Sequence, residues 1–183
     1  VVFSFNIPAS SFYALDSLFV ILFGAILSYV WIYLDKIKRN PSLPMKFSLS
    51  LLIMAAGFFI LVLGLYSVQP TALVSPLIIV CAYVLFAVAE LLISPIGTAM
   101  VDQLSPEGTE GRLMGVWQLF TGVAGALSGI LSQLAIIPPH TPAIQMHAVY
   151  SQAFIKIGSL TLLLAVLSLV IRPYLLKLLK PAS

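Results

Sequence analysis

One stretch of the chain reads Tyr83-Val-Leu-Phe-Ala-Val-Ala-Glu90-Leu-Leu-Ile-Ser94-Pro95-Ile-Gly97. It places the carboxyl group of Glu90 in the middle of an apolar run that extends from Leu77 to Met100. An unpaired carboxylate at that depth in hydrocarbon costs a few kcal/mol, so this acid is a candidate functional residue. Just beyond it, Pro95 removes a backbone hydrogen bond and Gly97 loosens the helix, which predicts a hinge. An acid beside a hinge on an apolar helix indicates the kind of binding or proton-carrying site that membrane transporters use.

The composition of the whole chain is that of a membrane protein. Of its 183 residues, 61% are hydrophobic and only 8% are charged, and the mean hydropathy is +1.11. Soluble domains have about 25% charged residues. This chain has too few polar residues to cover a water-facing surface, so it belongs in a lipid bilayer. Its basic residues lie in short clusters beside apolar segments, so nucleic-acid binding is not indicated.

Five apolar segments are long enough to cross a bilayer, which takes about twenty helical residues each. They predict an all-α membrane protein with transmembrane helices at residues 12–34, 47–68, 75–101, 113–137 and 152–171. Residues 1–11 would form a segment on the outer face, and residues 12–183 a single bundle. A proline-rich stretch that starts at Pro138 predicts a longer connection before the last span, in which His140 and His147 would be solvated.

The basic residues indicate how the chain is oriented in the membrane. Eight of the nine fall on one side of the predicted spans, and the positive-inside rule makes that side cytoplasmic. The amino terminus would therefore lie outside and the carboxy terminus in the cytoplasm, in a plasma (inner) membrane. An outer amino terminus is unusual for a complete multi-span protein, so we expect that a preceding segment is missing.

The fourth predicted span contains a pattern typical of packed helices. Gly111 and Gly115 are four residues apart, as are Gly125 and Gly129. Such pairs let a neighbouring backbone approach closely, which matters in lipid because helices there are not driven together by hydrophobicity. Trp117 lies on the same span, where it is either a core residue or the wall of a cavity.

The motifs of the third and fourth spans resemble those of the proton-dependent oligopeptide transporter family, which belongs to the major facilitator superfamily. In that family a glutamate-leucine-x-x-serine-proline-x-glycine stretch lies in the tenth helix, as at residues 90–97 here. A methionine-glycine-x-tryptophan stretch opens the eleventh, as at residues 114–117. Residues 7–19 and 150–158 resemble the starts of the eighth and twelfth helices, so the resemblance covers nearly the whole chain.

The resemblance implies that the five spans are helices eight to twelve of a twelve-helix carrier. Its substrates would be small peptides, its coupling ion the proton, and its mechanism alternating access between two six-helix halves. The chain would then be a fragment or split product that needs the missing amino-terminal half and is inactive alone. The alternatives are a carrier of the same family for an amino-acid derivative or nitrate, and a membrane assembly partner that transports nothing.

The resemblance also suggests roles for individual residues. Glu90 would hold the amino terminus of the peptide, with Ser94 orienting the acid, contacting substrate or bonding to its own helix. Trp117 would line the pocket. Asp16 departs from the family, in which asparagine followed by proline is common at this position. It either assists Glu90, with the two acids sharing one proton, or it is an acid in the first turn of its helix, where the helix dipole favours negative charge.

The motifs of common enzymes do not occur in this sequence. It contains no GxSxG, HExxH or phosphate-binding loop, and no cluster of His, Cys and Asp with the spacing of metal ligands. We therefore expect no enzymatic activity, no metal and no cofactor.

Overall fold

The computed structural model describes residues 9–69, 74–138 and 141–178. Within them lie five long helices and one short 3-10 helix: α1 (Ala9–Lys36), α2 (Leu43–Tyr66), α3 (Pro76–Leu104), α4 (Glu110–Ser132), η1 (Gln133–Ala135) and α5 (Ala143–Leu178). All five long helices are long and apolar enough to cross a membrane. The predicted all-α membrane fold is therefore confirmed. Most of the segment predicted at residues 1–11 lies outside the described residues.

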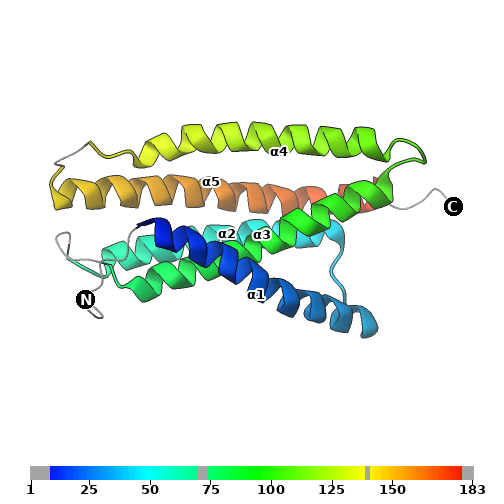
Figure 1. The fold of residues 1–183 in the computed structure, drawn as a ribbon, viewed down its shortest axis with the longest axis horizontal. Helices are drawn as coiled ribbons and strands as arrows, with labels where there is room; N and C mark the ends of the chain where they lie inside the picture. The colour runs from blue at the N-terminus through cyan, green and yellow to red at the C-terminus, as the bar shows by residue number, and fades with distance from the viewer. Residues whose placement is uncertain (1–8, 70–73, 139–140, 179–183) are drawn as a thin grey trace.

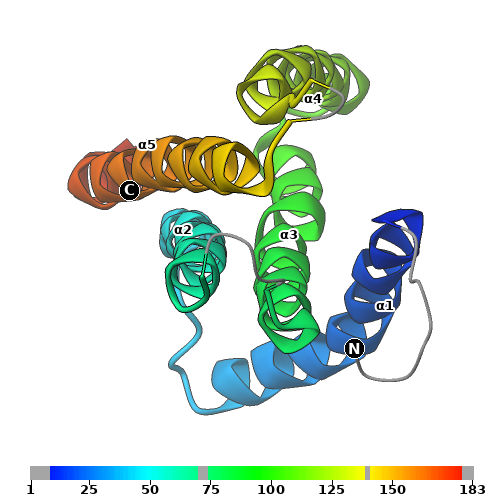
Figure 2. The same cartoon turned by 90° about the vertical axis from the view of Figure 1, so that its left-hand side faces the viewer.

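The helices run up and down beside one another along the long axis of the molecule (Figure 1). Seen from one end, α3 lies at the centre, with α1 on one side and α2 and α5 on the other (Figure 2). Helix α3 contacts α1, α2 and α4, and α5 packs along α2. The helix that bears Glu90 therefore lies at the centre of the bundle.

Helix α5 is longer at both ends than the predicted span. It begins at Ala143, directly after Pro142, so the connection after Pro138 is shorter than expected. It also continues through Pro173 to Leu178. Residues 143–151 are helical but include polar side chains, so hydropathy alone excludes them. Hydropathy reports which residues suit hydrocarbon, whereas a helix can extend beyond it.

The core of the bundle consists mainly of small residues. The buried side chains include Ala55, Ala82, Ala87 and Ala89, whereas many large aliphatic side chains are exposed. A β-carbon added at Gly57 of α2 would lie 2.5 Å from the Phe86 ring of α3, so the two helices approach this closely only because glycine is there. Small interface residues are typical of membrane helices, which associate through close packing.

Hydrogen bonds from polar side chains connect the helices. The hydroxyl of Ser50 on α2 donates to the Ala89 carbonyl of α3 at 2.6 Å, and the Ser48 and Ser168 hydroxyls are 2.8 Å apart across α2 and α5. Near the other end of α2, the imidazole Nε2 of His147 donates to the Leu65 carbonyl at 2.7 Å. The prediction that His147 is solvated is wrong, because α5 begins early enough to bring it against α2. His140 lies outside the described residues.

None of the described residues of helix α4 is buried, and the same holds for residues 14–36 of α1. A β-carbon added at any of its glycines, from Gly111 to Gly129, would meet no atom within 4 Å. The close helix contact that their spacing predicts is therefore not made by any part of the chain that the structure describes.

Candidate functional site

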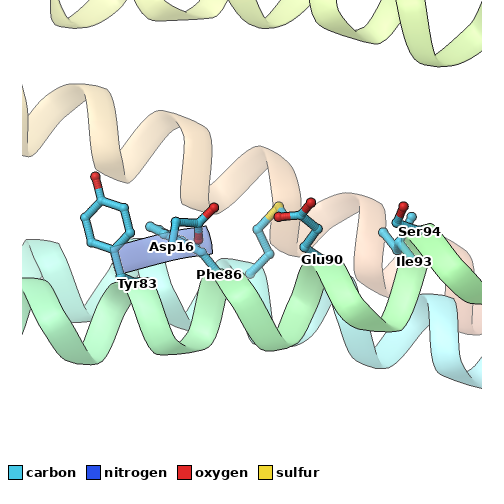
Figure 3. A pocket seen from close by; sticks show the side chains of 7 residues that line it. Asp16, Tyr83, Phe86, Glu90, Ile93 and Ser94 are labelled. Atoms are coloured by element: carbon cyan, nitrogen blue, oxygen red, sulfur yellow. The ribbon is translucent and has the colours of Figure 1, made fainter. Parts of the chain in front are cut away.

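The candidate site is built on one face of α3. Tyr83, Phe86, Glu90, Ser94 and Gly97 follow one another at intervals of three or four residues. Because an α-helix has 3.6 residues per turn, these positions lie on the same side of α3. Figure 3 shows the side chains of Tyr83, Glu90 and Ser94 directed to that side.

An acidic cavity of about 390 Å³ opens beside this face. It is lined by Asp16 of α1, Met54 of α2, and Tyr83, Phe86, Glu90, Ile93 and Ser94 of α3 (Figure 3). Its size is within the range of small-molecule sites. No basic residue is among these lining residues, so the cavity is suited to a cationic group.

The structure brings Asp16 and Glu90 to the same cavity, and Asp16 is only partly exposed. Helix α1 begins at Ala9, so Asp16 lies about two turns inside it. The interpretation of Asp16 as an acid in the first turn is therefore wrong. A helix dipole acts mainly over the terminal turn, so it gives no reason for a carboxylate at this position.

Ser94 lines the cavity, but Trp117 does not. The indole of Trp117 instead lies against Gly97 of α3, where a β-carbon would overlap it. Gly97 is two turns from Glu90 on the same face, so Trp117 sits farther along α3 from the acidic group. Its role as a pocket wall stays a prediction.

Helix α3 runs continuously through Pro95. Proline has no N–H to donate to the carbonyl one turn earlier, which weakens the helix locally. Just beyond it, the Thr98 hydroxyl donates to the carbonyls of Ser94 and Pro95, at 3.3 and 3.0 Å. The structure thus contains the features from which the hinge at Pro95 and Gly97 was predicted, and bending there stays a prediction.

Several lining residues were not singled out from the sequence. Tyr83 and Phe86 precede Glu90 by seven and four residues, so helical periodicity alone indicates them. Met54 carries no such signal, because only the packing of α2 on α3 brings it to the cavity. Among the described residues, no group of three or more His, Cys, Asp or Glu side chains could hold a metal ion.

Comparison with known proteins gives the family. The PTR2 model of the POT family matches residues 1–150, which is most of the chain. The chain belongs to the POT family.

Two curated relatives of this POT chain are permeases. Dipeptide and tripeptide permease B of Salmonella typhimurium is 31% identical over 175 residues, which are 95% of this chain and 36% of that permease. Dipeptide and tripeptide permease A of Erwinia pyrifoliae is 34% identical over 166 residues, 90% of this chain and 33% of the permease. The chain therefore spans about a third of the length of these relatives.

Solved POT structures share the fold. A POT family transporter in complex with 5-aminolevulinic acid matches with a TM-score of 0.73 at 26% identity, over 91% of this chain and 31% of that one. A POT family transporter in complex with a thioalcohol-conjugated peptide matches with the same values. The predicted family and its major facilitator type of fold are confirmed. The relatives are membrane transporters and not enzymes.

Proposed function

We propose that this chain forms most of the carboxy-terminal half of a proton-coupled symporter for di- and tripeptides. It works by alternating access and requires a partner that supplies the amino-terminal half. The observation that carries the proposal is the acidic cavity, which is lined by Glu90 of α3 and Asp16 of α1 in a chain with only 8% charged residues.

The chemistry of the cavity fits the amino terminus of a peptide. An ammonium group donates strong hydrogen bonds to carboxylates, and such charge-assisted bonds gain strength away from bulk water. Ser94 and Tyr83 add hydroxyl groups to the same cavity. When the ammonium group leaves, a proton takes its place at the site in the proposed cycle. That exchange links peptide movement to proton movement, with the proton gradient as the driving force and no cofactor.

Two observations support the need for a second half. Glu90 is exposed and α4 buries none of its described residues, so both are available to a further bundle of helices. In carriers of this type the substrate lies near the midplane between two repeats that rock against each other. The alternative of an assembly partner that transports nothing predicts instead that Glu90 is enclosed by the chain itself.

A carrier of the same family for an amino-acid derivative is the second candidate. The relative that binds 5-aminolevulinic acid favours it, since that ligand also presents a primary amine. A nitrate carrier fits less well, because an anion would be repelled by two carboxylates in one cavity. In the proposed orientation the amino terminus lies outside and the carboxy terminus in the cytoplasm, in a plasma (inner) membrane.

Uptake of a labelled dipeptide into proteoliposomes by the complete carrier tests the proposal. Glu90→Gln keeps the size of the side chain but removes its charge, so we expect uptake to fall about ten- to a hundredfold. Glu107→Gln is the matched control, because Glu107 lies in the exposed turn between α3 and α4 and should leave uptake unchanged. If the Glu90→Gln carrier took up the dipeptide as fast as the wild type, the proposal would be contradicted.

A further inference from the structure

Lys156 lies deep inside the membrane-spanning part of α5. Helix α5 packs along α2, and a β-carbon added at Gly158 would lie 3.1 Å from the β-carbon of Phe58, so these two residues are at the same level. Phe58 is close to the middle of the span predicted at residues 47–68. Because a helix rises about 1.5 Å per residue, Lys156 is about 3 Å from Gly158 along the axis, and thus closer to the middle of the bilayer than to its surface.

The depth of Lys156 makes its charge costly. The hydrocarbon extends about 15 Å on each side of its midplane, whereas an extended lysine side chain reaches about 6 Å. The ammonium group therefore stays in hydrocarbon unless another group compensates its charge. Lys156 is exposed, and it has no hydrogen bond or ion pair with any residue that the structure describes. Charged side chains at this depth face the interior of a bundle and pair with an opposite charge.

The surface of α5 that carries Lys156 is polar and faces away from α2. The buried residues of α5 include Gly158, Thr161 and Ala165. At about 100° per residue, Lys156 lies about 180° from Ala165 and about 140° from Thr161 around the helix axis. Four exposed polar residues lie within about 60° of one another on this side of the helix. They form the polar stripe, which consists of Gln145, Gln152, Lys156 and Ser159.

The polar stripe is not suited to contact with lipid. Amide, ammonium and hydroxyl groups that face hydrocarbon lose their hydrogen bonds to water and gain none in return. Helix α5 lies at the edge of the bundle, so its outer face is open to further helices (Figure 2). The chain spans about a third of the length of its permease relatives, which leaves room in a complete carrier for a helix that covers this face.

We propose that the polar stripe docks a helix of the complementary half, the partner that supplies the missing helices, and that Lys156 binds the carboxylate of an Asp or Glu on that helix. This inference rests on the proposed function, in which a second half completes the carrier. A carboxylate compensates the charge of an ammonium group and accepts its N–H groups, and this attraction is strong where water is excluded. The amides of Gln145 and Gln152 and the hydroxyl of Ser159 offer further hydrogen bonds to the same helix.

Co-purification of this chain with the complementary half tests the proposal. Lys156→Met removes the charge and keeps the length of the side chain, so it should weaken co-purification at least about tenfold, because the partner carboxylate loses its counter-charge. Lys156→Arg keeps the charge and should stay within about threefold of the wild type. Lys38→Met is the matched control and should change nothing, because Lys38 is exposed in the turn after α1. Neither Lys156 variant should lower the thermal stability of the chain alone, since Lys156 has no partner among its described residues.

Chemical cross-linking in the complete carrier identifies the partner group. A membrane-soluble carbodiimide activates a carboxyl group, and a neighbouring amine then attacks the activated carbon to form an amide, with the carbodiimide released as a urea. Mass spectrometry should find the Lys156 amine joined in this way to an Asp or Glu that lies outside the sequence of this chain.

The outcomes separate this inference from the proposed function. If the Lys156→Met chain co-purifies as the wild type does, the inference is overturned and the ammonium group reaches lipid phosphates instead. The absence of a cross-link at Lys156 also overturns it, as does a cross-link to a second copy of this chain, which would indicate a homodimer. A wild-type chain that does not bind the complementary half contradicts both proposals. Co-purification that depends on Lys156, in a carrier that takes up no dipeptide, contradicts only the proposed function.

Discussion

At Gly97 the indole of Trp117 occupies the space that a side chain of α3 would need. This contact joins α3 to α4. For the glycines of α4 itself, an added β-carbon would have no neighbour within 4 Å. The two residues belong to the two motifs by which the chain resembles its family. Their spatial relation suggests that the glycine of the first motif is there to accept the tryptophan of the second.

Substitution of Gly97 tests this steric relation. Gly97→Ala should destabilise the chain by about 1–3 kcal/mol, because the methyl group overlaps a ring that cannot shrink. Combining it with Trp117→Ala should remove most of that penalty, so the two effects will not add. Thermal unfolding in detergent measures both. Gly122→Ala is the control, since nothing lies within 4 Å of its added β-carbon. Additive effects of the two substitutions would show that the residues do not interact.

At the scale of the elements, α4 packs on α3 through Trp117 but buries none of its described residues. Helices α2, α3 and α5 associate through small buried residues, whereas α4 has none buried among its described residues. Its glycines nevertheless have the spacing that permits a close helix contact. We expect that the contact is made with the proposed amino-terminal half.

Leucine substitutions separate the two kinds of glycine. Gly122→Leu should leave the thermal stability of this chain unchanged but weaken its co-purification with the complementary half at least about tenfold, because the side chain blocks close approach. Gly57→Leu should instead lower the thermal stability of the chain itself, since its β-carbon would lie 2.5 Å from Phe86. Undiminished co-purification of the Gly122→Leu chain would exclude this face of α4 as the contact.

At the scale of the whole molecule, the five helices leave the acidic cavity open. Their up-and-down order brings the two ends of the described chain to opposite ends of the bundle (Figure 1). A carrier must close its substrate site to one side of the membrane before it opens the site to the other side. We therefore propose that transport by this chain requires a second set of helices.

Reconstitution tests this requirement. Proteoliposomes with this chain alone should show no dipeptide uptake above that of empty liposomes. Those that also contain the complementary half should accumulate dipeptide when a proton gradient is applied, and an uncoupler should reduce accumulation to equilibration. The opposite result, gradient-driven uptake by the chain alone, would mean that copies of this chain can form both halves.

The sequence by itself determined that the chain is a membrane protein, the five long helices of the described residues and the family, and it singled out Glu90, which lines the acidic cavity. These follow from local information, because hydropathy over twenty residues selects membrane spans and one carboxyl group within such a span stands out. Periodicity along α3 also indicates Tyr83 and Phe86, which share a face with Glu90.

Only the tertiary structure decided which side chains meet across helices. It brought Asp16 and Met54 to the cavity of Glu90, seated Trp117 on Gly97 instead of in that cavity, and placed His147 on the end of α2. It also formed a second, apolar cavity between α2, α3 and α5. The reason is physical. A membrane helix is apolar on all sides, so its hydropathy does not indicate which face contacts another helix; the neighbours are selected by how small and large side chains pack together.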